Sequence, residues 1–242
     1  MIFRLAAILA LAGGAVIAEP CRETTFEGTR YTVCEVAAGA DLRLFLRDAA
    51  GATLGSFARI DGLLAAEGAR LAFAMNAGMY HRDRSPVGLH VEQGQRLSEP
   101  VTAAGPGNFG MLPNGVFCVL PDRFAVIETR AFVRRDPGCI HATQSGPLLV
   151  IDGALHPRFI PGSPSRFVRN GVGISADGRR AAFAISGGRV SFHDFARFFR
   201  DHLGLRDALY LDGNISRLHA PGLGRSDIGF PMGPVVGLVV PR

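Results

Sequence analysis

Short apolar runs that end abruptly in a polar residue are the feature that most limits what this chain can fold into. Such runs fit buried strands, because a core helix needs a longer periodic pattern. Three of them are Leu71–Met75 before Asn76, Phe167–Val168 before Arg169, and Ala208–Leu211 before Asp212. A buried strand with this ending places the polar side chain at the start of a loop, and loops carry many of the binding and catalytic residues of proteins. We therefore expect Asn76, Arg169 and Asp212 to converge on one cleft.

Helical patterns are few. Ser191–Leu203 predicts the clearest helix, because its apolar residues recur at helical spacing and Gly204 follows. Ser56–Gly68 predicts a connection that contains a second helix and closes at the glycine. Alternating patterns over Tyr31–Leu46 and Ile174–Ile185 predict antiparallel hairpins, turned at Ala38-Gly39-Ala40 and Asp177-Gly178.

Strands therefore outnumber helices and do not alternate regularly with them. This pattern predicts an α+β fold with mixed, mostly antiparallel sheets and a few helices, rather than a doubly wound fold. No repeat or linker divides the chain. We expect residues 19–242 to form a single compact domain.

The first 18 residues have the pattern of a secretory signal peptide. Arg4 gives the segment a positively charged N-terminal end, Leu5–Ile17 is apolar, and small residues precede Glu19. This pattern predicts cleavage after Ala18. The apolar run is too short for a comfortable membrane anchor, and no later run is longer. We expect a periplasmic or secreted protein with no membrane insertion after cleavage.

All four cysteines follow this segment: Cys21, Cys34, Cys118 and Cys139. An exported chain reaches a compartment that permits disulfides, and four cysteines allow three connectivities. We favour Cys21–Cys34 and Cys118–Cys139, because each pair brackets a predicted hairpin. A metal site is disfavoured, since no C-x-x-C spacing occurs.

The basic residues, 26 in number, are all arginine. Without lysine the chain cannot form a Schiff base or a phosphate-loop lysine contact. The arginines are scattered rather than clustered with aromatic residues, so nucleic acid is not an expected partner. Arginine suits bidentate contact with phosphate or carboxylate, which favours an anionic substrate. A codon bias that enriches surface arginine is the alternative explanation for most of them.

Four motifs follow one another in a fixed order. They are Asn76-Ala77-Gly78-Met79-Tyr80, Ser145-Gly146-Pro147-Leu148-Leu149 with Asp152-Gly153, Arg169-Asn170-Gly171-Val172-Gly173, and Leu211-Asp212-Gly213-Asn214-Ile215-Ser216. Each is weak alone, but the ordered set resembles the phosphodiester glycosidase family from Leu71 to the C-terminus. Ala77 and Asn214 replace glycines of the family pattern and Met79 an aromatic residue, which indicates a divergent branch.

The resemblance implies hydrolysis of the bond between a sugar's anomeric carbon and a phosphodiester, with a sugar-phosphate as the anionic substrate. Asp212, Arg169 and Asn76 are the implied catalytic residues. Asp212 would act as nucleophile, as base toward water or as stabiliser of the positively charged sugar, while Arg169 clamps phosphate oxygens. The implied substrate-binding residues are Gly78, Tyr80, His81, Ser145, Gly146, Asn170, Gly213, Asn214 and Ser216. The polar loop Met79–Gly88 is a further place for binding groups.

Simpler explanations exist for each residue alone. Asp212-Gly213 is the pattern of an ordinary turn, Arg169 could form a surface ion pair, and Asn76 could cap a turn. No metal is expected, because the seven histidines lack ligand spacing, although calcium bound by Asp212 and carbonyl oxygens is an alternative. No other cofactor is expected. The predicted function is an exported sugar-1-phosphodiester hydrolase of envelope glycan metabolism; the alternative is a non-catalytic periplasmic module that binds an anionic glycan.

Overall fold

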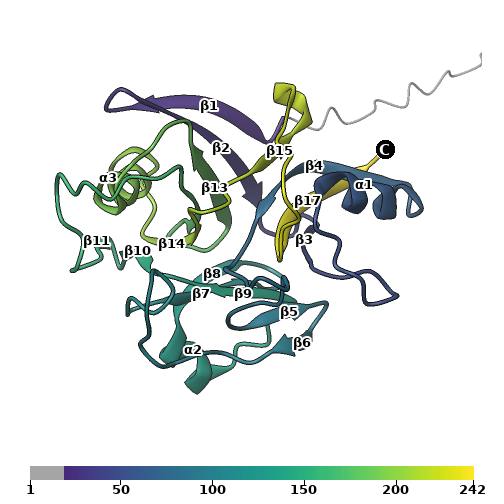
Figure 1. The fold of residues 1–242 in the computed structure, drawn as a ribbon, viewed down its shortest axis with the longest axis horizontal. Coiled ribbons are helices and arrows are strands. Elements are labelled where there is room, and N and C mark those ends of the chain that lie inside the picture. Colours follow the sequence, from purple (N-terminus) through teal and green to yellow (C-terminus); the bar gives the residue numbers. More distant parts are fainter. Residues whose placement is uncertain (1–18) are drawn as a thin grey trace, which may run out of the picture.

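Three antiparallel sheets surround one shared core in this computed structural model, and a helix covers the outer face of each sheet (Figure 1). The structure describes residues 19–242, so the predicted signal segment 1–18 lies outside the described residues. The prediction of an α+β fold with mostly antiparallel sheets is confirmed. Within residues 19–242, no helix has the length and apolar character needed to cross a membrane.

The first sheet has seven strands in the order β1-β2-β13-β12-β14-β10-β11. They are β1 (Cys21–Phe26), β2 (Thr29–Ala37), β10 (Leu148–Ile151), β11 (Ala154–Leu155), β12 (Asn170–Ile174), β13 (Arg180–Ser186) and β14 (Asp207–Asp212). The hairpin predicted around Asp177-Gly178 is confirmed as β12 and β13. β12 also pairs with β14, and this register sets Asn170 opposite Asp212. The strand predicted at Ala208–Leu211 is confirmed as β14, but the buried strand predicted at Phe167–Val168 is wrong: Phe167 is 45% exposed, and β12 begins only at Asn170, after Arg169.

The second sheet has five strands in the order β16-β15-β4-β17-β3. They are β3 (Leu42–Phe45), β4 (Ala69–Asn76), β15 (Leu218–Ala220), β16 (Arg225–Ser226) and β17 (Val235–Pro241). β4 lies at its centre and ends at Asn76. Soon after Asp212 the chain enters this sheet at β15, whose Leu218 pairs with Met75. The ends of β4 and β14 are thus brought together from different sheets.

The third sheet has five strands in the order β6-β5-β9-β7-β8. They are β5 (His90–Glu92), β6 (Gln95–Ser98), β7 (Gly115–Val119), β8 (Phe124–Glu128) and β9 (His141–Ser145). The long segment between β6 and β7 contains no regular element. It returns toward the first sheet and contributes to the pocket described below.

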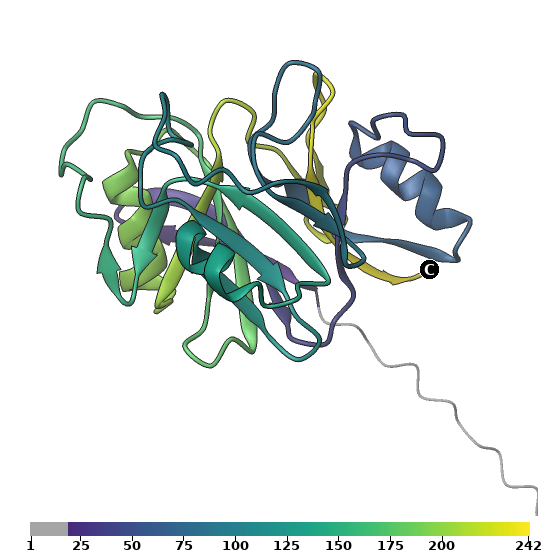
Figure 2. The same cartoon turned by 90° about the horizontal axis from the view of Figure 1, so that it is seen from below.

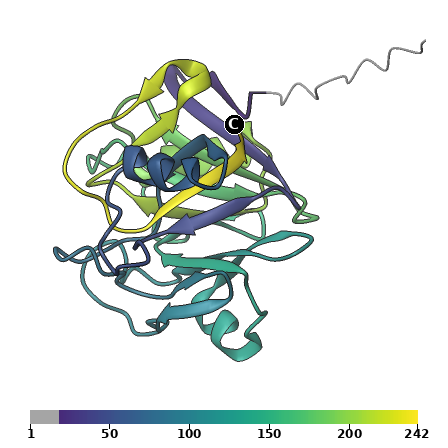
Figure 3. The same cartoon turned by 90° about the vertical axis from the view of Figure 1, so that its right-hand side faces the viewer.

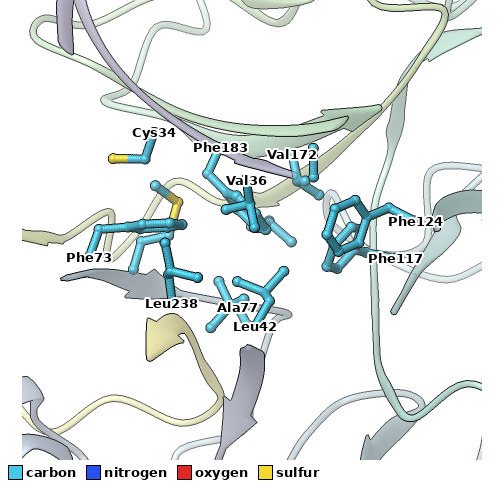
Figure 4. Close-up of a cluster of buried hydrophobic side chains, with 14 of the residues drawn as sticks. Cys34, Val36, Leu42, Phe73, Ala77, Phe117, Phe124, Val172, Phe183 and Leu238 are labelled. Carbon is cyan, nitrogen blue, oxygen red and sulfur yellow. The ribbon is translucent and has the colours of Figure 1, made fainter. Parts of the chain in front are cut away.

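Side-chain alternation explains why one core can serve three sheets. Because successive residues of a strand point to opposite faces, each sheet sends one set inward and the other outward. Phe73, Phe117 and Phe183 come from the second, third and first sheets and meet in the centre (Figure 4). The ring of Phe183 lies 5.5 Å from Phe73 and 5.4 Å from Phe117, measured between centroids.

The outward sets are covered by helices. α3 (Phe192–Arg197), continued by the π-helix η1 (Phe198–His202), packs on the first sheet, and α2 (Thr129–Arg135) packs on the third (Figure 2). α1 (Phe57–Ala65) packs on the second sheet (Figure 3). A short 3-10 helix, η2 (Pro221–Leu223), separates β15 from β16.

The helices predicted near Ser56 and Ser191 are confirmed, and each begins after its serine. The Ser56 hydroxyl accepts the backbone N–H of Arg59 at 3.3 Å. Ser191 forms a capping box with Asp194, in which each side chain accepts the other residue's backbone N–H. The first turn of each helix thus has partners for N–H groups that the helix itself cannot satisfy.

The hairpin predicted over Tyr31–Leu46 is wrong. Its two halves are β2, which pairs with β1 and β13, and β3, which pairs with β17 of another sheet. β2 is a central strand with both faces covered, since Val33 packs toward α3 and Cys34 toward the central core. The turn at Ala38-Gly39-Ala40 therefore carries the chain from one sheet to the next.

The favoured disulfide pairing is confirmed. Cys21–Cys34 joins β1 to β2 within their hairpin, where the two residues are directly opposite. Cys118–Cys139 joins β7 to the segment after α2. Each bond closes a local loop and so restricts the unfolded chain.

Candidate active site

A pocket of about 450 Å³ opens where the segments after β4, before β7 and after β14 meet. Its wall combines apolar, cationic and acidic groups. The residues that line it are Met79, Tyr80, His81, Arg82, Arg84, Val87, Pro106, Gly107, Asn108, Phe109, Asp212, Asn214 and Ile215. A pocket with many apolar residues and a few convergent polar ones is typical of a small-molecule site.

Asp212 supplies the one carboxylate of this wall. It is the last residue of β14 and only 9% exposed. Its Oδ1 accepts the backbone N–H groups of Gly213 at 2.6 Å and Asn214 at 2.9 Å, and no cation of residues 19–242 forms an ion pair with it. Burial raises the pKa of Asp212, and these N–H groups oppose the rise. A buried, unpaired carboxylate in a pocket is a candidate catalytic group.

Asn76 lies behind the pocket rather than in its wall. It is fully buried at the end of β4, and its Oδ1 accepts the backbone N–H of Arg217 at 2.9 Å. Asn170 connects it to the carboxylate strand. The Asn170 amide donates to the Asn76 carbonyl oxygen at 2.8 Å, and its Oδ1 accepts the backbone N–H of Asp212 at 3.0 Å. Asn76 and Asn170 therefore hold the two strand ends in register.

Arg169 is also fully buried and does not line the pocket. Its guanidinium carbon lies 3.6 Å from the ring centroid of Phe192 and 5.3 Å from that of Tyr210. Nε donates to the carbonyl oxygen of Val190 at 2.9 Å and Nη2 to that of Ser165 at 3.2 Å. Burial lowers its pKa, an effect that Tyr210 partly offsets. Arg169 is therefore a cation held against aromatic rings, and not the surface ion pair of the simpler explanation.

Of the three residues expected to share one cleft, the structure places only Asp212 in the pocket wall. Among the predicted substrate-binding residues, Tyr80, His81 and Asn214 also line it. The others lie in the surrounding framework, and the catalytic and binding roles stay predictions.

The framework serines bond to the backbone. Ser145 Oγ donates to the carbonyl oxygen of Leu211 at 2.8 Å, which ties β9 to β14. Ser216 Oγ lies 3.0 Å from the carbonyl oxygens of Val168 and Asp212, to either of which it can donate. These contacts brace the strand and the turn that present the carboxylate.

The framework glycines permit close approach of the chain to other groups. A Cβ at Gly78 would overlap the carbonyl oxygen of Gln144, and one at Gly213 would overlap the Tyr210 hydroxyl. At Gly146 a Cβ would lie 2.6 Å from that of Asn114. Only glycine therefore fits at these three positions without displacing a neighbouring atom.

Sequence reasoning did not single out the pocket's two cations, Arg82 and Arg84. Both lie in the polar loop after β4, which was flagged only as a whole. The Arg84 guanidinium carbon lies 5.6 Å from the ring centroid of Tyr80. Asn108 and Phe109 of the irregular segment before β7 were also missed, because no periodic signal marks them.

No group of three or more metal-ligating side chains lies close together in the part of the chain that the structure describes. Calcium prefers roughly six to eight oxygen ligands. The pocket wall supplies one carboxylate, and its Oδ1 already accepts two N–H groups. The calcium alternative therefore stays an untested prediction.

Comparison with known proteins identifies relatives of both sequence and fold. The model of the phosphodiester glycosidase family matches residues 69–219, which include Asn76, Arg169 and Asp212. "Uncharacterized protein YigE" of Escherichia coli (strain K12) is 38% identical over 153 residues, which are 63% of this chain. The chain spans 59% of the length of that relative.

A solved structure shares the fold. It is the catalytic domain of zebrafish N-acetylglucosamine-1-phosphodiester alpha-N-acetylglucosaminidase, auto-inhibited by its pro-peptide. The match has a TM-score of 0.58 at 12% identity and covers 90% of this chain and 81% of the zebrafish chain. At this identity the likeness concerns the fold.

Proposed function

This chain belongs to the phosphodiester glycosidase family, and from that premise we propose that it is an exported hydrolase that cleaves a sugar-1-phosphodiester. The observation that carries the proposal is Asp212, a buried carboxylate without a cationic partner in the wall of a pocket that also holds Arg82 and Arg84. The reaction breaks the bond between the anomeric carbon and the phosphate oxygen. Water supplies the hydroxyl of the released sugar, and a phosphate monoester leaves.

This leaving group explains why one carboxylate is enough. An ordinary glycosidase protonates a poor leaving group with one carboxylic acid and uses a second carboxylate on the other face of the sugar. A phosphate monoester departs as a stable anion and needs no such proton. Asp212 then attacks the anomeric carbon, takes a proton from water or stabilises the positively charged sugar. All three roles need the ionised form, so the raised pKa of Asp212 predicts that activity falls as the pH drops through it.

The phosphate contact is assigned to the pocket cations. Arg82 and Arg84 line the wall, and guanidinium groups bind phosphate oxygens in a bidentate manner. His81 and Asn214 line the same wall and provide hydrogen-bonding groups for the sugar, whereas Tyr80 contributes its ring, because its hydroxyl is buried.

Asn76 and Arg169 act from behind this surface. Asn76 fixes the end of β4, to which the binding loop is attached, by its contacts with Asn170 and Arg217. Arg169 fixes Tyr210, whose hydroxyl lies against Gly213 beside the carboxylate. Both are proposed to position the site rather than to touch substrate.

Export and an envelope role are part of the proposal. Two disulfides in residues 19–242 support an oxidising compartment, because such bonds are rare where thiols are kept reduced. The signal-peptide pattern of the first 18 residues predicts that the chain is exported. In a periplasm or outside the cell, the substrate would be a sugar-phosphate of envelope glycan metabolism.

The test is hydrolysis of a panel of methyl sugar-1-phosphodiesters by the purified protein, followed by release of free sugar and methyl phosphate. Wild type should turn over at least one sugar, and Asp212→Asn should lose about 10³-fold or more in kcat, the scale on which essential carboxylates act. Asp177→Asn is the matched control, because Asp177 is exposed in a turn outside the pocket. Undiminished turnover by Asp212→Asn would remove this residue from catalysis.

The same panel tests the alternative of a non-catalytic binding module. Calorimetric binding of a sugar-1-phosphodiester without turnover by wild type would support that module and exclude the hydrolase. Turnover that Asp212→Asn loses while retaining affinity would exclude the module.

A further inference from the structure

The two large apolar side chains with the highest exposed fractions in residues 19–242 lie in one short loop. Ile228 is 93% exposed and Phe230 is 78% exposed, and both belong to the loop between β16 and β17. The residue between them, Gly229, has φ +154°. Single exposed apolar residues are ordinary, but two almost fully exposed large ones at a loop tip indicate an interaction surface.

This loop, residues 227–233, is fixed to the pocket wall. The Arg217 guanidinium donates to the carbonyl oxygen of Phe230 at 2.5 Å, and Gly229 packs against the same group. Gly233 packs against the ring of Tyr80, which lines the pocket. Figure 2 shows the loop, in yellow, beside the loop that follows β4. Ile228 and Phe230 therefore project from the framework of the pocket itself.

The pocket wall contains an apolar part beside its charged groups. Met79, Val87, Phe109 and Ile215 contribute to it together with the two arginines. A phosphate and a sugar present mainly charged and hydroxyl groups. This combination of apolar and cationic lining fits a phosphodiester whose second substituent is a hydrocarbon.

The charge around the loop favours an anionic partner. Asp227, the acid of the loop, is paired with Arg225, whose Nε and Nη2 donate to it at 3.0 Å and 2.8 Å. Arg82 and Arg84 lie in the adjoining loop, and the chain has a formal net charge of +5. Exposed apolar side chains flanked by arginines are the pattern of proteins that lie on anionic bilayers.

We propose that Ile228 and Phe230 insert into an anionic lipid bilayer, and that the pocket takes a sugar-1-phosphodiester whose aglycone is a membrane lipid. The insertion of Ile228 and Phe230 into a bilayer is argued from the loop alone. The lipid aglycone rests on the proposed hydrolase function. Docking by this loop would hold the pocket at the surface from which the sugar headgroup of such a lipid projects.

The first experiment measures binding to vesicles. Wild type should sediment with vesicles of phosphatidylcholine and phosphatidylglycerol and less with phosphatidylcholine alone, and added salt should weaken binding. The double variant Ile228→Asp/Phe230→Asp should partition about tenfold more weakly, because it loses the inserted apolar surface and adds charge. Val133→Asp on α2, where Val133 is 47% exposed, is the matched control and should bind as wild type does.

Binding to anionic vesicles that the double variant retains would overturn the docking surface. So would a failure of wild type to bind either vesicle. Sedimentation equilibrium adds a specific contrary outcome, since a dimer that wild type forms and Phe230→Asp loses would assign the loop to an interface between copies of this chain. Thermal melts of each variant show that it is folded.

The second experiment separates this inference from the function on which it rests. It compares hydrolysis of methyl and hexadecyl N-acetylglucosamine-1-phosphodiesters, the second embedded in anionic vesicles. The double variant should hydrolyse the methyl ester as wild type does and the hexadecyl ester about tenfold more slowly. If the double variant hydrolyses the hexadecyl ester as fast as wild type does, the lipid assignment is overturned while the hydrolase stands. Vesicle binding without turnover of either ester would overturn the lipid substrate and leave the docking surface intact.

Discussion

Asn170 Oδ1 accepts the backbone N–H of Asp212 at 3.0 Å, and this bond fixes the residue that presents the only carboxylate of the pocket wall in the described chain. The same side chain donates to the carbonyl oxygen of Asn76 at 2.8 Å. Asn170 therefore ties β14 of the first sheet to β4 of the second. The pocket is built where these two sheets are joined, and its geometry depends on a buried amide.

Replacing Asn170 with alanine should damage both stability and activity. It would leave the Asp212 N–H and the Asn76 carbonyl oxygen buried without partners, at about 1–3 kcal/mol for each group. Urea unfolding should show this loss, and kcat/KM measured well below the melting temperature should fall by about tenfold or more, because Asp212 loses its anchor.

Leu64→Ala is the control for that experiment. Leu64 is fully buried in α1, outside the pocket, and its truncation should cost about 2–5 kcal/mol. The folded fraction of this variant should keep its activity. Equal activity in the two variants would show that Asn170 matters for stability alone.

Arg82 and Arg84 should govern substrate binding if they hold the phosphate. Each Arg→Gln change removes a charge-assisted contact worth about 1.5–3 kcal/mol, so kcat/KM should fall by roughly 10- to 100-fold. The loss should shrink as salt is added, because salt screens the remaining charges. Arg134→Gln on α2, outside the pocket, is the control. Unchanged kinetics in both pocket variants would move the phosphate site elsewhere.

Local patterns were enough to predict much of the fold. The β12–β13 hairpin, the capped helices and both disulfides all depend on residues close in sequence. The error over Tyr31–Leu46 has a different origin. Alternation shows that β2 and β3 are strands, but it does not say which strands they pair with. That choice is made by the central core, to which distant segments contribute.

The same limit applies to the candidate site. Asp212 was located because a buried strand ends there. Arg169 immediately precedes β12 and Asn170 is its first residue, and their side chains point in different directions: Asn170 toward Asp212, and Arg169 toward Phe192. Sequence alone does not say which of the two side chains turns toward Asp212, and neither of them lines the pocket. Arg82 and Arg84 lie in an irregular loop, where no period marks which side chain turns inward.

Gly78→Ala should be strongly destabilising. The added Cβ would overlap the carbonyl oxygen of Gln144 and the Thr143 hydroxyl, and a backbone atom cannot move aside cheaply. Overpacking of this kind costs about 1–3 kcal/mol or more. Gly62→Ala is the matched control. Gly62 lies in α1 with no atom near its Cβ position, so alanine should stabilise the protein by about 1 kcal/mol. The melting temperature should fall for Gly78→Ala and rise for Gly62→Ala. A shift in the same direction for both variants would contradict the prediction.

Asp212→Asn should stabilise the protein at neutral pH even though we expect it to abolish activity. Burial raises the pKa of Asp212, so between its ordinary value and the raised one the folded state binds more protons than the unfolded state. Stability conferred by this residue therefore falls as the pH rises through that window. Asparagine does not ionise and escapes the loss. The gain should be about 1.4 kcal/mol for each unit of pKa difference and should vanish as the pH falls below the window.

Asp177→Asn provides a control of opposite sign. Hydrogen bonds from Ser175 and Arg179 lower the pKa of Asp177, so its ionised form is favoured by folding, and its replacement should reduce stability at neutral pH. Urea unfolding of both variants across the acidic range measures the two trends. A destabilised Asp212→Asn at neutral pH would mean that its carboxylate is favoured by the fold. The raised pKa, and with it the picture of a carboxylate held ready at a cost to stability, would then be wrong.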